Sequence, residues 1–493
     1  KNNAESFEQF IWLQTLFGRL LVCVILMHVS VVILMRKEQT LKMIRDFFSE
    51  VGSPHNLAIF RIIVFFLIIG SFIGEVFGEF ANWTYLDDSH RVGLPFIRWF
   101  TDLLPINPQL YFIVSIIGLA LAICVLFGFK TRYALFAYVP IALYLWGVPN
   151  FFGKLNHRHI MVWVPIILSM SRCGDVISID YLIQRYRNKK PKPQPSVEYA
   201  LPLKFVWITI AIIYCCSGFH KLWDAGLHWA LSDNLRNQIL LEWVEQYDQV
   251  KSIRIDHYPL LLRFGAISVI VMEILFPLFI FKSYLRPFAL LSSWSLHLSA
   301  GYFLSIDFVQ LRFMNLSFVN WSYFKKKRSP VSRSEEPSVP YDFRKFRSMR
   351  FMYVVVPLVS INLLFGILQI NSWPFSGYPS YSSTVSNEVT LIRLDATTAD
   401  SINVDVKRIA QEANFRWENL RPFEERIMDK YNSDDSTGLS IQLEEYWQLW
   451  DTKLSGLEEV KTVKMYFETT SVIPEKRELI LDSGYLGTVI DAD

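Results

Sequence analysis

Apolar residues along the 493-residue chain gather in long blocks, and the charged residues gather between the blocks. A membrane-spanning α-helix needs about 20 predominantly apolar residues, and ten blocks approach that length. They cover residues 9–35, 57–78, 110–129, 133–151, 159–172, 200–219, 261–282, 286–305, 308–324 and 351–370, of which the fifth and ninth are short. The pattern therefore predicts an all-α polytopic membrane bundle of about ten transmembrane helices.

The pattern changes after Pro379, where polar and apolar residues mix and acidic residues outnumber basic ones. Helical stretches are predicted near 400–430 and 438–455. Strand-like runs are predicted at 389–394, 460–469 and 478–481. Together they predict a small C-terminal α+β extramembrane domain.

Strongly basic connections indicate the orientation in the membrane. They are residues 36–45, 130–132, 185–192, 282–286 and 325–350, and ten spans put all of them on one side. Cytoplasmic loops carry an excess of Lys and Arg, so this side is predicted to be cytoplasmic. The loops 79–109, 152–158 and 220–260 and the C-terminal domain then lie outside the cytosol. We expect an integral protein of the bacterial inner membrane with a periplasmic domain, or of the ER membrane with a lumenal one.

The expected organisation has five parts, each set by these blocks and connections. They are an N-terminal transmembrane anchor with its cytoplasmic connection at 1–50, a transmembrane core at 51–324, a basic cytoplasmic linker at 325–350, a last transmembrane helix at 351–370 and the α+β domain at 371–493. No small-residue cleavage site follows the first block, and more spans do, so it is predicted to be a retained anchor.

Several classes of site are excluded by composition and motifs. The five cysteines lie in or beside apolar blocks, which counts against a disulfide framework. The chain has no Walker loop, dinucleotide fingerprint, HExxH, CxxC or GxSxG motif. His157 and His159 point in different directions at a helix start. We therefore expect no metal site and no nucleic-acid partner, and nothing in the pattern specifies an oligomeric state.

Ionisable residues inside the predicted spans are functional candidates, because an unpaired charge in hydrocarbon costs several kcal/mol. They are Arg19, His28, Arg61, Glu273, His297 and Arg312. The alternative is that such residues pair across the bundle, Glu273 with Arg61 for example, and only fasten helices together.

A second group is predicted at the outer membrane surface. Asn156 and His157 precede the fifth span, and His220 and Lys221 end the sixth. A lysine there can extend its amine towards headgroups and water. Alternatively, burial favours a neutral amine that acts as a base. Local sequence does not choose between the two.

Six segments in this part of the chain share their order and spacing with a known family. They are LAIFRIIVFFLIIG, TYLDD, KLNHRHIMVW, YCCSGFHKLWDAGLHW, VMEILFPLFIF and SLHLSAGYFLSID. From Leu57 to Trp321, the chain resembles the horizontally transferred transmembrane domain family, whose best-known member is the vitamin K-dependent gamma-glutamyl carboxylase.

The resemblance implies a role for several residues. Lys221 matches the catalytic lysine, and His157 with Asn156 matches the reacting centre. Substrate-binding roles are implied for Arg61, Trp229, Glu273 and His297.

The activity implied is that of a carboxylase (a carbon-carbon lyase) with epoxidase activity. In the family, a neutral lysine deprotonates vitamin K hydroquinone, which reacts with oxygen to give a strongly basic alkoxide. That base removes a γ-proton from a protein glutamate, and the carbanion captures carbon dioxide. The expected cofactor is reduced vitamin K or a related quinol, with no metal, and the expected partners are membrane lipid and a glutamate-containing protein or peptide.

Departures from the family keep other interpretations open. His220 stands where the animal enzyme has a second lysine, and Ala300 stands where an asparagine is expected. The C-terminal domain is also much shorter, and the cysteines of the animal disulfide have no counterpart. The alternative is a non-catalytic binding, immunity or sensor module of the same family. A transporter is a third hypothesis, because prolines in several spans can break helices.

Overall fold

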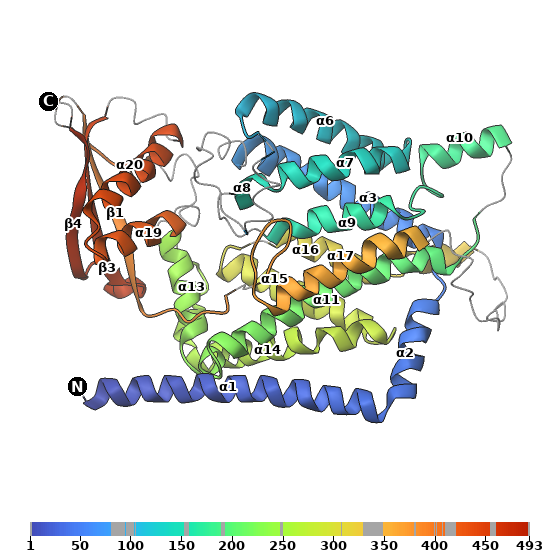
Figure 1. The fold of residues 1–493 in the computed structure, drawn as a ribbon, viewed down its shortest axis with the longest axis horizontal. Coiled ribbons are helices and arrows are strands. Elements are labelled where there is room, and N and C mark those ends of the chain that lie inside the picture. Colours follow the sequence, from blue (N-terminus) through green and yellow to red (C-terminus); the bar gives the residue numbers. More distant parts are fainter. Residues whose placement is uncertain are drawn as a thin grey trace. The chain divides into compact units, whose positions relative to one another are not determined.

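The computed structural model is mostly helical, with one small antiparallel sheet near the C-terminus (Figure 1). It describes residues 2–79, 94, 103, 105–151, 157–188, 193–246, 250–306, 308–328, 349–378, 381–398, 400, 402–406, 408–409, 421–453 and 460–491. The chain divides into two compact units. Unit 1 contains residues 1–227, 268–301 and 307–382, and unit 2 contains residues 228–267, 302–306 and 383–493.

Unit 1 is a bundle of helices. In chain order these are α1 (Asn2–Met35), α2 (Lys37–Ser49), α3 (Pro54–Ser71), the π-helix η1 (Phe72–Glu79), α6 (Pro108–Phe127), α7 (Thr131–Leu145), α8 (Val148–Phe151), η4 (His157–His159), α9 (Ile160–Ser169), α10 (Ile179–Asn188), α11 (Val197–Asp224), α16 (Val309–Met314), η6 (Asn315–Phe318), η7 (Trp321–Arg328) and α17 (Met349–Ile367). Helices α14 (Pro259–Phe281) and α15 (Arg286–Phe303) contribute residues to both units.

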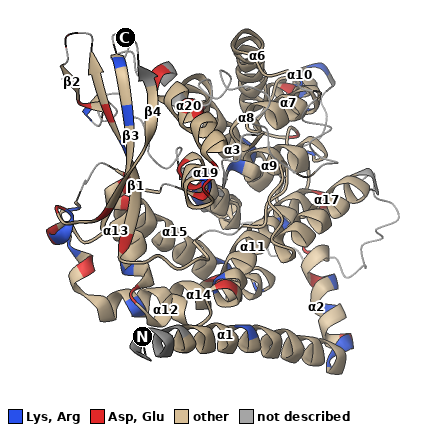
Figure 2. Cartoon of the chain, turned by 60° about the vertical axis from the view of Figure 1, so that its left-hand side comes forward, with Lys and Arg blue, Asp and Glu red and all other residues tan. Residues whose placement is uncertain are grey.

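Five helices are long and apolar enough to cross a membrane. They are Gln9–Met35, Pro54–Gly78, Pro108–Phe127, Val197–Asp224 and Pro259–Phe281, and shorter apolar helices lie at Ile160–Ser169 and Phe351–Ile367. The long apolar helices of unit 1 carry few charges along their length, whereas the shorter α2 and α10 carry several (Figure 2). The chain is therefore a helical protein with several candidate membrane spans, and the further spans of the predicted ten stay a prediction.

The predicted ninth span, 308–324, is not one helix. Helix α16 has six residues and is followed by the 3₁₀-helices η6 and η7. Polar side chains explain the break, because Asn320 Oδ1 accepts hydrogen bonds from Asn56 Nδ2 at 3.0 Å and from Ser322 Oγ at 2.6 Å. Such local bonds compete with those of a continuous helix.

Helix ends in unit 1 follow from short-range sequence signals. Asn107 Oδ1 accepts a hydrogen bond from the backbone N–H of Leu110 at 2.8 Å and so caps the start of α6. The helix ends at Gly128, whose φ of 70° favours glycine. Within the bundle, 83% of the α11 span is buried, whereas only 11% of the α1 span is. Helix α11 is therefore the central helix of unit 1, and α1 lies at its periphery.

Unit 2 contains a four-stranded antiparallel sheet in the order β2-β1-β3-β4. Its strands are β1 (Glu388–Thr398), β2 (Asn403–Val404), β3 (Val460–Ser471) and β4 (Ile480–Asp491), and its C-terminal helices are α19 (Arg421–Asn432) and α20 (Ser436–Lys453). Every predicted strand overlaps an observed one. The predicted α+β character of this region is confirmed.

The sheet shares its unit with residues 228–267, which form α12 (His228–Leu231), α13 (Asn234–Glu245), η5 (Ile255–His257) and the start of α14. Apolar residues of α13, among them Leu240 and Trp243, bury against Val472 at the end of β3. The sheet therefore packs against the segment of chain that links α11 to α14.

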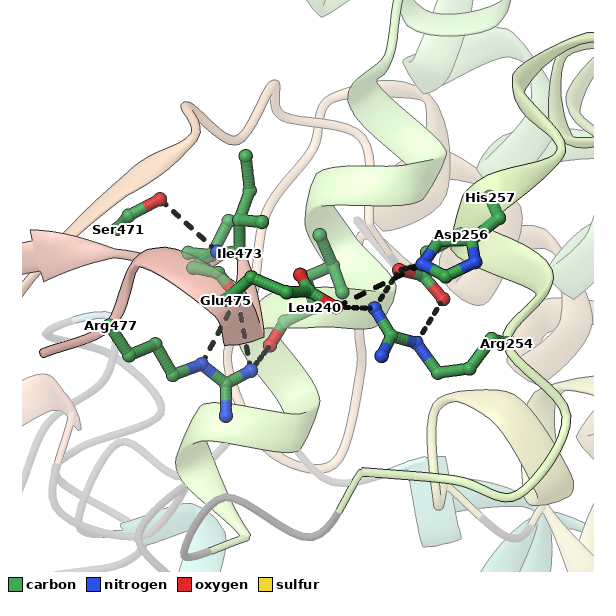
Figure 3. A network of polar contacts seen from close by, with 9 residues as sticks. Leu240, Arg254, Asp256, His257, Ser471, Ile473, Glu475 and Arg477 are labelled. Carbon is green, nitrogen blue, oxygen red and sulfur yellow. Dashed lines mark hydrogen bonds and ion pairs between the residues drawn. The ribbon is translucent and has the colours of Figure 1, made fainter.

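Polar contacts reinforce this packing (Figure 3). The guanidinium of Arg254 donates two hydrogen bonds to Asp256, at 2.9 and 2.8 Å, and one to Glu475 at 2.6 Å. Arg477 donates to the carbonyl oxygens of Leu240 and Val472, at 3.3 and 3.0 Å. The turn between β3 and β4 is thus joined to the 240–256 region by an ion pair and by backbone acceptors.

Arg254 shifts the protonation of both carboxyl groups. Burial alone would raise the pKa of Asp256, but the hydrogen bonds and charge of Arg254 outweigh it and hold that pKa below its usual range. The hydrogen bond from Arg254 likewise lowers the pKa of Glu475. Both carboxyl groups are therefore ionised at neutral pH.

Candidate functional site

Lys221 lies in the last turn of α11 and is buried, with 3% of its surface exposed. Its Nζ donates hydrogen bonds to Ser217 Oγ at 2.8 Å and to the two carboxylate oxygens of Glu273, on α14, at 3.0 and 2.9 Å. Glu273 is 5% exposed. The structure therefore joins two residues that the sequence singled out separately, and it replaces the expected pairing of Glu273 with Arg61.

Small residues on α11 make this contact possible. A Cβ added at Gly218 would lie 2.9 Å from Glu273 Cβ and 3.1 Å from the backbone nitrogen of Ile274. Any larger residue would push α14 away from α11, because real Cβ atoms essentially never approach other atoms that closely. Gly218 thus sets the helix separation at which a lysine and a glutamate can meet.

The pair is suited to holding a proton in a dry environment. Transfer of a proton from the ammonium to the carboxylate leaves the pair without net charge. An isolated buried ion is costly, whereas a hydrogen-bonded pair satisfies both partners. The proton that the two groups share can therefore move between Lys221 Nζ and Glu273 without placing an unpaired charge in the bundle.

A second polar cluster lies on the same face of α11. Tyr214, two turns before Lys221, has its Oη 2.5 Å from Nε2 of His297 on α15. Asn315 Nδ2, from η6, donates to Tyr214 Oη at 3.4 Å. All three side chains are buried. His297, predicted from sequence, thus lies beside the face of α11 that also carries Lys221.

Sequence reasoning missed three members of these clusters, Tyr214, Ser217 and Asn315. Tyr214 and Ser217 lie seven and four residues before Lys221, and this spacing places all three on one helix face. That periodicity is a signal that identifies Tyr214 and Ser217. Asn315 had no such signal, because it reaches Tyr214 from a separate segment.

Only part of the predicted reacting centre lies within the described residues. Asn156 lies outside them, and His157 is described only as the first residue of η4. The next residue, Arg158, binds Glu75 through Nε at 2.8 Å. Gln310 Nε2 donates to the other oxygen of Glu75 at 2.9 Å. Glu75, on the π-helix η1, therefore connects η4 with α16.

Glu75 was also missed, although it is an acid within a predicted span, the same signal that identified Glu273. Lys204 was missed likewise. It is fully buried on α11 and donates to the backbone oxygens of Phe47 and, at 3.1 Å, Glu50. Backbone acceptors therefore let Lys204 fasten α11 to the end of α2, and its ion pair with Glu50 Oε2, at 3.7 Å, is longer than that of Lys221 with Glu273.

Two further residues were predicted to bind substrate, Arg61 and Trp229. The guanidinium of Arg61 is fully buried and donates to the carbonyl oxygens of Cys173 at 3.0 Å and Ile177 at 2.5 Å. It therefore holds the turn between α9 and α10, and these hydrogen bonds go to backbone oxygens and not to Glu273. Trp229 is buried and belongs to unit 2.

The structure also describes the cysteines and the residues that could bind a metal ion. All five cysteines are free. Among the residues that the structure describes, no group of three or more His, Cys, Asp or Glu side chains is arranged to hold a metal ion.

Comparison with known proteins adds no relative. No protein-family model, curated protein or solved structure matches the chain.

Proposed function

We propose that this chain is a membrane enzyme of the vitamin K-dependent gamma-glutamyl carboxylase type, in which Lys221 and Glu273 form the base that receives a quinol proton. One observation carries the proposal. The lysine assigned as catalytic by resemblance is buried and hydrogen-bonded to both oxygens of Glu273, an acid that the resemblance assigned to the same pocket. The two residues are 52 positions apart and on different helices.

The chemistry of the buried groups fits a quinol. Reduced vitamin K, on reaction with oxygen, supplies a base far stronger than any side chain, which only a water-excluding site can preserve. Glu273 first takes a proton from Lys221, which leaves a neutral amine. Lys221 Nζ then accepts the phenolic proton, and the new ammonium is balanced by the quinol anion that forms. His297 and Tyr214 offer a further donor and acceptor on the same helix face, and His157 with Asn156 is proposed to orient the reacting centre.

The proposed orientation puts the basic connections in the cytoplasm and the C-terminal domain in the periplasm or ER lumen. It is supported by contacts within unit 1 between segments that the prediction puts on one side. Gly52 forms a β-bridge with Ser196. Glu50 Oε2 lies 2.8 Å from Arg286 NH2. Glu50 and Gly52 follow the basic connection 36–45, Ser196 follows 185–192 and Arg286 ends 282–286, as expected if the intervening helices all cross the membrane.

The proposal is tested with the full chain reconstituted in lipid vesicles. Reduced vitamin K, a glutamate-containing peptide, oxygen and labelled bicarbonate are supplied, and epoxide and labelled peptide are measured. Lys221→Ala should abolish epoxide formation, and an added small amine should partly restore it. Lys282→Ala, which removes an exposed lysine, is the control. Wild-type epoxide formation by Lys221→Ala would overturn the assignment.

The second candidate is a non-catalytic binding or sensor module in which the pair only fastens helices. The bidentate contact favours it, because Lys221 is already satisfied by protein atoms. The two candidates differ in one outcome. A fastening pair is replaceable by apolar residues without loss of function, whereas a catalytic pair is not.

A further inference from the structure

Helix α1 crosses the end of α11 at two glycines. A Cβ added at Gly18 would lie 2.4 Å from both the carbonyl oxygen of Leu222 and Cα of Gly226. Gly226 has φ of 64°, and its own added Cβ would lie 2.2 Å from the carbonyl oxygen of Gln14. The two backbones are therefore in direct contact, in the manner of membrane helices that meet at small residues.

Hydrogen bonds join the same two segments. Arg19 Nε donates to the carbonyl oxygen of Trp223 at 3.0 Å, and its guanidinium lies 5.7 Å from the centre of the Trp223 ring. Leu227 N donates to the carbonyl oxygen of Gln14 at 3.1 Å. The last carbonyl groups of a helix lack partners within it and carry partial negative charge, so a guanidinium is a complementary cap.

This crossing encloses the turn that carries Lys221. Leu222 and Trp223, the next two residues, are among those that α1 contacts. Their neighbours are held by other segments, since His220 Nε2 lies 2.8 Å from the carbonyl oxygen of Gly366 and Gln369 Nε2 donates to Asp224 at 3.0 Å. Most of the remaining surface of α1 is exposed. Helix α1 therefore packs mainly against the turn of α11 that carries Lys221.

We infer that α1 is a positioning element for Lys221: through Gly18 and Arg19 it completes the end of α11 and holds the amine against Glu273. Arg19 is therefore a positioning residue, and it has no contact with the reacting atoms. The inference gives a function to an N-terminal helix that lies outside the region resembling the carboxylase family. Its catalytic consequence rests on the proposed function, but its structural consequence does not.

The experiment compares Gly18→Val with Gly70→Val in the full chain. Both glycines lie in apolar helices, but a Cβ at Gly70 meets no atom within 4 Å. Three readouts are used: crosslinking of Gln14→Cys to Leu227→Cys by a short bismaleimide in a background without the native cysteines, acylation of Lys221 by a membrane-permeable succinimidyl ester, and kcat and KM for epoxidation of reduced vitamin K.

Gly18→Val should lose the crosslink and increase the acylation rate of Lys221, while Gly70→Val should match the wild type. A misplacement of about 1 Å can lower turnover about a hundredfold, so kcat should fall by about that factor with little change in KM. Arg19→Gln should reduce kcat by a smaller factor, and Arg19→Lys should restore much of it because it keeps a cation at the helix end.

Two outcomes separate this inference from the proposed function. If Gly18→Val loses the crosslink but keeps wild-type acylation of Lys221, then α1 does not position the lysine and the inference is overturned. If the wild-type protein forms no epoxide, the proposed function fails, while the acylation of Lys221 in Gly18→Val and Gly70→Val still decides whether α1 positions it.

Discussion

At the scale of single residues, the proposed function rests on the pair of Lys221 and Glu273. Both charges are removed from water, and their mutual hydrogen bonds compensate for the loss of hydration. Removing one partner leaves the other buried and uncompensated, whereas removing both does not. This asymmetry separates the contribution of the pair to stability from its contribution to chemistry.

We predict that Lys221→Met destabilises the protein by about 3–5 kcal/mol, because it strands the Glu273 carboxylate. The double variant Lys221→Met, Glu273→Leu should recover most of that stability but form no epoxide. Thermal unfolding in detergent and epoxide assays measure the two effects. Ser217→Ala, which removes one hydrogen bond from the amine, is the control and should cost about 1 kcal/mol. Epoxide formation by the double variant would leave the pair a purely structural role.

The residues of the site were predictable only as separate candidates. Glu273 stood out because it interrupts an apolar run, and Lys221 because it ends the sixth predicted span at the outer surface. Their pairing depends on how α11 crosses α14, which Gly218 permits but sequence spacing does not specify. The partners of Arg61 could not be predicted from the sequence either. A buried arginine suggested an acidic partner, but its partners are the carbonyl oxygens of Cys173 and Ile177, and backbone acceptors leave no mark in the sequence.

At the scale of elements, the lengths of the long helices were readable from apolar blocks and caps, but departures from regular helix were not. The last turns of α3 continue as the π-helix η1, a geometry that is rare and is found mostly near functional sites. It carries Glu75, which binds Arg158 in η4. Since His157 is the preceding residue, this ion pair holds the 3₁₀-helix η4 to which His157 belongs.

We predict that Glu75→Arg lowers kcat for epoxide formation about tenfold or more, because it repels Arg158 and shifts η4. The double variant Glu75→Arg, Arg158→Glu should recover part of the loss. Hydrogen exchange of residues 157–169 should rise in the single variant and return towards wild type in the double. Gly74→Ala in the same π-helix is the control, since an added Cβ there meets no atom within 4 Å. Equal kcat values in the single and double variants would exclude a role for the pair.

At the scale of the whole molecule, each unit has its own stabilising contacts. In unit 2, Arg254 keeps Asp256 and Glu475 ionised, and the pKa values of both carboxyl groups lie lower in the folded protein than in the unfolded chain. The sign follows from linkage. The stabilisation is fully present above the ordinary carboxyl pKa values and is lost as the pH falls through the lowered ones.

We predict that unit 2 keeps its stability from neutral pH down to the ordinary pKa values of its carboxyl groups, 3.8 for Asp and 4.5 for Glu, and loses stability below them. Hydrogen exchange of residues 460–491, corrected for the intrinsic rate at each pH, measures the effect. Arg254→Gln should lower the protection already at neutral pH and weaken its dependence on acid. An unchanged acid profile in that variant would show that other carboxyl groups control it.

The orientation of the chain is also testable. Tyr186 on α10 is 92% exposed and Tyr485 on β4 is 53% exposed. In a background without the native cysteines, we predict that a membrane-impermeant maleimide labels Tyr485→Cys from the non-cytosolic side of a sealed membrane. Tyr186→Cys should be labelled only after the membrane is permeabilised. Labelling in the reverse pattern would invert the proposed topology.

Unit 2 is assembled from stretches of chain that are synthesised far apart in time. Residues 228–267 leave the ribosome first, and Val472, which directly follows β3 and buries against α13, comes more than two hundred residues later. Contacts so distant in sequence form slowly, because a long loop must close before they contribute. Leu262 and Phe303 can pack on the apolar side of α13 earlier, but its cluster is complete only after β3 has been synthesised.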